Sequence, residues 1–332
     1  MRSHELNRNI SFVVHSITRK HEGTVQIRQL EYLVALAHEK HFARAAERCN
    51  VSQPALSLAL KQIEAELGVA IVQRGNRFLG LTREGDIVLK WAQRLLLDEE
   101  TLKQELRLCT NSLSGRLRLG VIPSATAISS LLITAFAREN GDVSITDLEM
   151  TSIDILRSIA SFELDAGITY IDNEPLDHVR AHPIGREEYV LVTPGDSPVA
   201  GLAEVTWSQA AALPLCLLHR DMQNRRIIEA IFESVGARPN ARIETNSMMS
   251  KYCYLRSGYW SSVMPRSFVE WLAPPPGLHI APLVEPKIMK TVGLVIGDRS
   301  PVAPLLLAFW RTSIASTVGQ IITGPELMMP KT

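Results

Sequence analysis

The segment FARAAERCNVSQPALSLALKQIEAEL, residues 42–67, decides the fold of the amino-terminal part, because its pattern is that of two helices joined by a tight turn. A short helix is expected over Ala43–Cys49, with the turn at residues 50–51. Ser52 is a suitable N-cap, and Pro54 fits the first turn of the next helix, where no amide donor is needed. The segment therefore predicts a helix-turn-helix.

The second helix of this pair has one apolar and one polar side. Its apolar side is expected to be buried and consists of Ala55, Leu56, Ala59, Leu60, Ile63 and Leu67. Its polar side carries Gln53, Ser57, Lys61 and Gln62. Amide and hydroxyl groups on such a helix suit base edges in the major groove, and Lys61 suits a phosphate. The alternative is an ordinary packed helix with a solvated face.

A basic turn follows this pair of helices. Arg74, Gly75, Asn76 and Arg77 separate two apolar runs, Val69–Val72 and Phe78–Leu81. Two short strands with a basic tip form the wing of a winged helix-turn-helix, which favours DNA binding over the solvated-face alternative.

Three stretches of the amino-terminal part carry a family resemblance. They are LEYLVALAHEKHFARAAERCNVSQPALS, LKQIEAELGVAIVQR and LTREG, all within Arg28–Gly85. The chain resembles the LysR-type transcriptional regulators from about Val25 to about Ser316, and the SQPALS run is highly specific. The family consists of an amino-terminal winged helix-turn-helix, a long helix and a two-lobed, periplasmic-binding-protein-like effector domain.

The resemblance also assigns roles within the DNA-binding head. It implies that Gln53, Pro54, Ser57 and Lys61 lie on the DNA-reading helix and that Arg74 and Arg77 lie in the wing. Two positions depart from the family pattern. At the position of Leu58 the family often has a polar or basic residue, and at the position of Ala43 it often has a hydroxyl that binds phosphate. These departures bear on base preference and affinity.

Length and charge agree with several domains and a local DNA contact. The chain has 332 residues and a formal net charge of zero, but Arg28–Arg83 holds eight Lys/Arg against five Asp/Glu. We expect a leader over residues 1–24, a DNA-binding head over 25–82, a linker helix over 83–113 and an effector domain over 114–326. The effector domain should comprise lobe I (about 115–187 and 288–326) and lobe II (about 188–287). The leader suggests either a true start at Val25 or a disordered arm.

The linker helix is expected to mediate self-association. Between Arg83 and Leu113 apolar residues recur at steps of three and four, interrupted by Glu99: Val88, Ala92, Leu95, Leu102, Leu106, Cys109 and Leu113. This pattern predicts a heptad seam that pairs two heads in a dimer or tetramer. A single buried helix is the alternative.

The remaining chain predicts an α/β fold, with a doubly wound parallel sheet and helices on both faces. Expected strands and helices alternate from Arg116 onward, and a second lobe begins near Tyr189. The strand Lys290–Ile296 and the helix Pro304–Ser316 should return to the first lobe. Two crossings between lobes should create a cleft.

Polar residues follow the expected strands where ligands bind in such folds. The expected effector residues are Ser124, Thr126, Thr151, Ser152, His219, Asn246 and Ser247. They suit a small anionic or polar metabolite, which the resemblance also implies. The alternative for each hydroxyl is a plain N-cap. Arg220 and Arg225 could also pair with a carboxylate, and surface solvation is the alternative for Arg225.

Two further features leave alternatives open. Tyr259 and Trp260 stand where relatives have a glycine-rich run, and they could either line the cleft or belong to the core. Cys49, Cys109, Cys216 and Cys253 form no metal-binding spacing and are expected to be reduced, mostly buried thiols. A redox pair would require Cys216 and Cys253 to meet.

The sequence favours a binding protein over an enzyme. It contains no G-x-S-x-G elbow, no H-E-x-x-H, no phosphate-binding loop and no G-x-G-x-x-G after a strand. No run of eighteen apolar residues occurs, so no membrane span is expected.

We predict a cytoplasmic, sequence-specific transcriptional regulator that requires no metal or cofactor. Its expected partners are promoter DNA, further copies of itself, a small-molecule effector and RNA polymerase. A solute-binding receptor or an enzyme on the same scaffold is the alternative.

Overall fold

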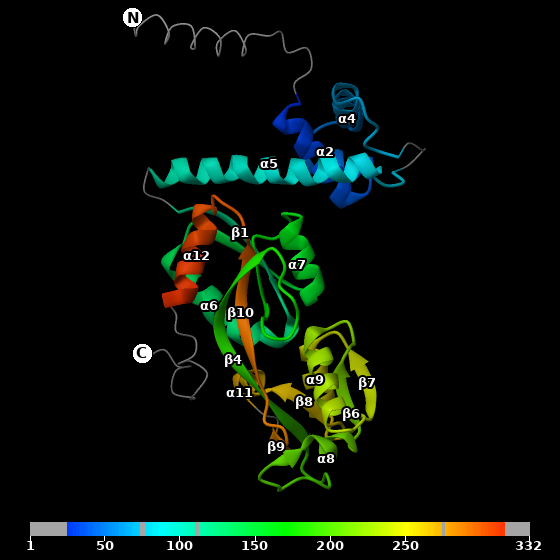
Figure 1. The fold of residues 1–332 in the computed structure, drawn as a ribbon, viewed down its shortest axis with the longest axis vertical. Coiled ribbons are helices and arrows are strands. Elements are labelled where there is room, and N and C mark those ends of the chain that lie inside the picture. Colours follow the sequence, from blue (N-terminus) through cyan, green and yellow to red (C-terminus); the bar gives the residue numbers. More distant parts are fainter. Residues whose placement is uncertain (1–24, 74–77, 110–112, 274–275, 316–332) are drawn as a thin grey trace, which may run out of the picture. The chain divides into compact units, whose positions relative to one another are not determined.

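The computed structural model describes residues 25–73, 78–109, 113–273 and 276–315. The chain divides into two compact units between Glu100 and Thr101, inside the helix α5 (Arg83–Leu108). The amino-terminal unit is helical, and the carboxyl-terminal unit contains the sheets (Figure 1).

The first unit is a helical head built on α2 (Ile27–Glu39), α3 (Phe42–Arg48) and α4 (Gln53–Leu67). Its core includes Leu33, Leu36, Leu56, Ile63 and Ile71, all fully buried. Apolar residues at helical spacing on α2 and α4 supply one face of each helix to this core. The predicted helix-turn-helix is therefore present.

The ends of α4 follow from its sequence. The Ser52 hydroxyl accepts a hydrogen bond from the Ala55 backbone N–H, so the predicted N-cap is confirmed. The helix ends at Gly68, whose φ of 68° suits a residue without a side chain. The expected burial of Ala55 and Leu67 is wrong, because Ala55 lies at the margin of the apolar side and Leu67 is the last helical residue, 43% exposed.

The two segments of the predicted wing pair as a short hairpin. Val72 and Leu81 form an antiparallel bridge, and the backbone N–H of Gln73 donates to the carbonyl of Gly80 at 3.0 Å. The Glu64 carboxylate fixes the first segment by accepting from the Ile71 N–H at 2.8 Å. Arg74 and Arg77, at the tip, lie outside the described residues.

The helix α5 does not expose one continuous seam. Ala92 is buried and Val88 packs against the core of the head, so both belong to that core. Leu95, Leu102 and Leu106 are exposed, at 44%, 56% and 61%. The first two positions of the predicted seam are therefore used by the head for its own packing, and pairing of two copies through the remaining positions stays a prediction.

The second unit contains an eight-stranded sheet with the order β2-β1-β3-β10-β4-β9-β5, and β8 pairs with β4. A separate two-stranded sheet pairs β6 with β7. The strands are β1 (Gly115–Val121), β2 (Val143–Glu149), β3 (Ala166–Tyr170), β4 (Val179–Pro194), β5 (Val205–Thr206), β6 (Leu215–Leu218), β7 (Ala241–Thr245), β8 (Ser262–Pro265), β9 (Leu278–Val284) and β10 (Met289–Gly297).

The sheet is mixed, whereas the sequence predicted a parallel one. β2, β1 and β3 are parallel, but β10 is antiparallel to β3 and β4. The difference arises because β10 returns from the second lobe and runs back along the first. β4 and β10 are long strands that link the two lobes, so the two predicted crossings are present (Figure 1).

Helices cover the sheets of each lobe. Lobe I carries the short turn η1 (Pro123–Ala125), α6 (Thr126–Glu139), α7 (Ser152–Ala160) and α12 (Pro304–Ala315). Phe136 of α6 packs edge-on against Phe309 of α12 with ring centroids 5.1 Å apart. Lobe II carries α8 (Trp207–Ala211), α9 (Gln223–Ser234), α10 (Met248–Arg256) and α11 (Arg266–Leu272).

Candidate nucleic-acid interface and effector site

The outward side of α4 is the candidate nucleic-acid interface. Gln53, Pro54 and Lys61 are exposed and Ser57 is half-buried, opposite the buried side of the helix. With about 100° of rotation per residue, Leu58 falls near the middle of this outward side, and it is 59% exposed. The surface therefore combines amide, hydroxyl, ammonium and apolar groups on one helix.

One side chain of this helix is held by its neighbour α2. The amide of Gln29, which is buried, donates to the Gln62 side-chain oxygen at 3.1 Å. This contact orients Gln62 and leaves its own amide group for another partner. Within the described residues Lys61 forms no ion pair, so its charge is available to a phosphate.

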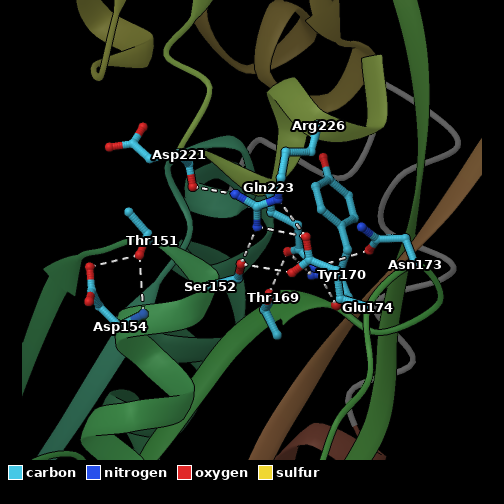
Figure 2. A network of polar contacts seen from close by, with 10 residues as sticks. All are labelled: Thr151, Ser152, Asp154, Thr169, Tyr170, Asn173, Glu174, Asp221, Gln223 and Arg226. Carbon is cyan, nitrogen blue, oxygen red and sulfur yellow. Dashed lines mark hydrogen bonds and ion pairs between the residues drawn. The ribbon is translucent and has the colours of Figure 1, made fainter. Parts of the chain in front are cut away.

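The candidate effector site lies where lobes I and II meet, and Figure 2 shows the polar contacts that Gln223 and Arg226 make there. Gln223, at the start of α9, is 2% exposed and reaches across to the end of β3. Its side-chain oxygen accepts from the Thr169 hydroxyl at 2.6 Å and from the Tyr170 N–H at 3.2 Å. Its amide donates to the Tyr170 carbonyl at 3.1 Å and to the Asn173 side chain at 3.0 Å. One residue of lobe II is thus bound to three residues of lobe I.

A second polar contact between the lobes centres on Arg226, one turn further along α9. Its guanidinium donates to the Glu174 carboxylate at 2.7 Å and to the Ser152 hydroxyl at 3.0 Å. Ser152 in turn donates to Glu174 at 3.1 Å, and Arg226 also binds the backbone oxygen of Asp221. Ser152, an expected effector residue, is therefore occupied by an interlobe ion pair in this structure (Figure 2).

The structure gives local roles to several other expected effector residues. Thr151 and Ser247 are N-caps that accept from the backbone N–H groups of Asp154 and Ser250. The Thr126 hydroxyl donates to the carbonyl of Pro123 at 2.9 Å. The N-cap alternative therefore accounts for Thr151 and Ser247, whereas Thr126 is not an N-cap and its hydroxyl also donates to the Glu149 carboxylate at 3.3 Å.

The remaining expected groups of lobe II lie at the surface or are already paired. His219 bonds to the exposed Asp221 at 2.8 Å, and Asn246 is exposed. The alternative that Arg225 is solvated at the surface is wrong, because this side chain is 1% exposed and pairs with Glu229 and Glu244 at 2.7 Å each.

Ser124 belongs to a different group of buried polar side chains, which we call the inner cluster: Ser124, Tyr170, Glu187, Tyr189 and Asn224. Ser124 follows β1, Tyr170 ends β3, Glu187 and Tyr189 lie on β4, and Asn224 lies on α9. All five are at most 3% exposed. The Asn224 amide donates to the Tyr170 hydroxyl at 3.4 Å. The hydroxyls of Ser124 and Tyr189 approach the Tyr170 hydroxyl closely enough to influence its pKa.

Burial controls the charge of the inner cluster. It raises the pKa of Glu187 to about 8, while hydrogen bonds from the Ser267 hydroxyl and N–H oppose the shift. Burial, with the neighbouring Glu187 charge, also raises the pKa of Tyr170. Burial together with Tyr170 and Glu187 raises the pKa of Tyr189. All three side chains are therefore predominantly protonated and neutral near pH 7.

Comparison with known families matches both units. Residues 27–86 match the bacterial regulatory helix-turn-helix protein of the lysR family, and residues 110–316 match the LysR substrate binding domain. The chain belongs to the LysR family of transcriptional regulators. Its resemblance to that family, drawn from the SQPALS region, is thereby confirmed.

Individual relatives of this LysR-family regulator are moderately similar. It is 28% identical over 283 residues to the DNA-binding transcriptional dual regulator OxyR of Escherichia coli, covering 83% of this chain and 91% of that protein. It is 27% identical over 278 residues to the hydrogen peroxide-inducible genes activator of Pectobacterium carotovorum, covering 83% and 92%.

Solved structures share its fold. A full-length OxyR variant from Pseudomonas aeruginosa is 26% identical, with a TM-score of 0.70 and coverage of 90% of this chain and 100% of that one. CbnR complexed with its target DNA, at 20% identity and a TM-score of 0.63 over 88% and 99%, shows the fold alone.

Two features of the LysR-family regulator concern alternatives left open by its sequence. Tyr259 is 66% exposed and packs edge-on against Trp260 at 4.8 Å, so its assignment to the core is wrong. All four cysteines are free thiols, but the expectation that they are mostly buried is wrong, because only Cys216 is buried, Cys49 is intermediate, and Cys109 and Cys253 are exposed. In the described part of the chain, no group of three or more His, Cys, Asp or Glu could hold a metal. Over the same residues, no helix is both long and apolar enough to cross a membrane.

Sequence reasoning missed most residues that join the lobes. Gln223 and Asn224 stand at the start of a helix after a strand, so the rule that selected Ser124 would also have selected them. Glu187 and Tyr189 carried no such signal, because they lie inside the strand β4 and not at its end.

Proposed function

We propose that this regulator reads promoter DNA through the outward side of α4 and that a small polar molecule bound between lobes I and II controls it. The observation that carries the first part is the outward set of Gln53, Ser57 and Lys61, of which Gln53 and Lys61 are exposed, on the second helix of a helix-turn-helix in a LysR-family chain. The second part is supported by the buried polar groups that both lobes contribute to one place.

The control mechanism follows from the interlobe contacts. Gln223 and Arg226 bind lobe I directly, so the angle between lobes depends on contacts that a ligand can strengthen or replace. A ligand shifts the regulator between two arrangements by binding one of them more tightly. In an oligomer such a shift changes the spacing of the DNA-binding heads.

The proposal extends to partners and location. We place the regulator in the cytoplasm as a homo-oligomer that pairs through the exposed leucines of α5, contacts RNA polymerase at its promoters, and needs no cofactor beyond its effector. We assign it no enzymatic activity, since its family relatives are regulators.

The names of the relatives introduce hydrogen peroxide as an alternative signal. Burial raises the pKa of Cys216, which lowers the fraction of reactive thiolate. We therefore favour non-covalent control, and we expect peroxide treatment to leave the DNA footprint unchanged.

Selection from random duplex DNA followed by footprinting tests the proposal. We expect the purified regulator to enrich one sequence, and Gln53→Ala or Ser57→Ala to change the preferred bases. Matched variants in the second unit, Gln209→Ala and Ser130→Ala, should retain the wild-type sequence. Enrichment of no sequence, with or without small molecules, would refute the function.

A further inference from the structure

The inner cluster contains fully enclosed polar atoms whose hydrogen bonding is incomplete. Within the described residues, Ser124 Oγ, Glu187 Oε2, Tyr189 Oη and Asn224 Oδ1 make no hydrogen bond of normal geometry. Buried polar atoms are normally satisfied, because an unpaired one loses its hydration without compensation. Four such atoms in one place indicate a site built for a ligand.

The cluster draws on every part of the interlobe region. Ser124 and Tyr170 stand at the carboxyl ends of β1 and β3 in lobe I, and Asn224 comes from α9 in lobe II. Glu187 and Tyr189 are two residues apart on the crossing strand β4, so their side chains share one face. A molecule bound here would touch both lobes and the strand that connects them.

The chemistry of these atoms favours an uncharged ligand. A protonated Glu187 and the three hydroxyls can donate, and Asn224 Oδ1 can accept. Besides Glu187, the charged groups that act on the inner cluster are the carboxylates of Glu270 and Asp172, so both are acidic. An anion would lie beside these acids, and a buried anion needs a positive partner.

The two arginines that follow Asn224 on α9 are already paired. Arg226 binds Glu174, and Arg225 binds Glu229 and Glu244. We propose that the effector is a small uncharged molecule carrying hydrogen-bond donors and acceptors, such as an amide or a polyol, bound by the inner cluster. This proposal rests on the proposed function, since it names the chemical class of the effector.

The test compares neutral, anionic and cationic forms of the same molecular skeleton. The probes are propionamide, propionate and propylamine; benzamide, benzoate and benzylamine; and glycerol, glycerate and serinol. The readout is the Tm of the full-length regulator at pH 7 with each probe at millimolar concentration. A molecule that binds only the folded state raises Tm.

We expect the neutral member of at least one set to raise Tm by a few degrees while its charged counterparts do not. Ser124→Ala and Tyr189→Phe should each abolish that rise. Ser130→Ala should preserve it, because its hydroxyl bonds to the carbonyl of Ala127 within α6. Using two inner-cluster variants keeps the test decisive if one of them fails to fold.

Three outcomes would overturn the proposal. A rise with the carboxylate alone would show an anionic effector, and a rise with the amine alone would show an ion pair with Glu187. No rise with any probe would make the inner cluster a purely structural network. DNA binding without additive is measured on the same samples, so loss of the DNA-binding function is recognised separately from an error in the effector class.

Discussion

Gln223→Ala tests how strongly the two lobes are held together. The substitution removes four hydrogen bonds of a side chain that is 2% exposed, to Thr169, Tyr170 and Asn173. Each such bond contributes about 0.5–1.5 kcal/mol, and a buried partner left unpaired costs about 1–3 kcal/mol. Because these contributions are not additive, we expect a loss of about 2–5 kcal/mol in the free energy of unfolding of the second unit.

The matched control is Gln209→Ala, which removes an exposed glutamine from the capping box of α8. Loss of a cap costs about 0.5–2 kcal/mol, and this exposed position should fall at the low end. Urea unfolding followed by circular dichroism gives the loss in free energy of unfolding for both variants, and their m values are compared with that of the wild type. A Gln223→Ala loss equal to that of Gln209→Ala would refute the reasoning that this residue joins the lobes.

Four further predictions follow from the same structure. Lys61→Ala should weaken binding to all DNA sequences alike. It should also reduce the slope of the logarithm of the binding constant against the logarithm of the salt concentration by about 1, measured by titration at several salt concentrations. An unchanged slope would contradict a phosphate contact. Replacing thymine by uracil in the selected site should weaken binding by the wild type but not by Leu58→Ala, because we expect the exposed Leu58 side chain on the outward side of α4 to contact a thymine methyl group. Equal effects on both proteins would exclude that contact. Gly85→Ala should destabilise the head by about 1–3 kcal/mol in urea unfolding, because the added Cβ would lie 2.1 Å from the backbone oxygen of Ile71. The control Gly141→Ala, which has open space around it, should leave the free energy of unfolding nearly unchanged. The pKa of Glu187 is about 8 in the folded chain, against an ordinary value of 4.5, so between these pH values the folded chain retains a proton that the unfolded chain loses. The free energy of unfolding therefore falls as the pH rises from 4.5 to about 8, and Glu187→Gln should flatten that fall in unfolding curves recorded over this range. An unaltered pH profile would show that Glu187 does not cause the fall.

Local signals in the sequence were sufficient to predict the helix-turn-helix of the head. Ser52 and Pro54 fixed the start of α4, and the spacing of Leu56, Leu60 and Ile63 fixed its buried side. These features depend on residues close in the chain, so periodicity and capping rules apply directly. The exposure of Leu67 was missed because Leu67 is the last residue of α4, and periodicity alone does not show where a helix ends.

Long-range pairing limited the prediction of the second unit. The alternation of strands and helices in lobe I was predicted, yet the antiparallel direction of β10 depends on how the chain returns from lobe II, which no local pattern encodes. The contacts of Gln223 with Thr169 and Tyr170 join residues more than fifty positions apart. Polar residues at strand ends were therefore only partly informative, and Thr151 and Ser247 proved to be caps.

The most direct test of the central claim is the sequence selected from random duplex DNA by the wild type and by Gln53→Ala. If the outward side of α4 reads base edges, the two selections should share an overall site and differ at a few base pairs. Identical selections would place sequence recognition elsewhere in the head and contradict the account.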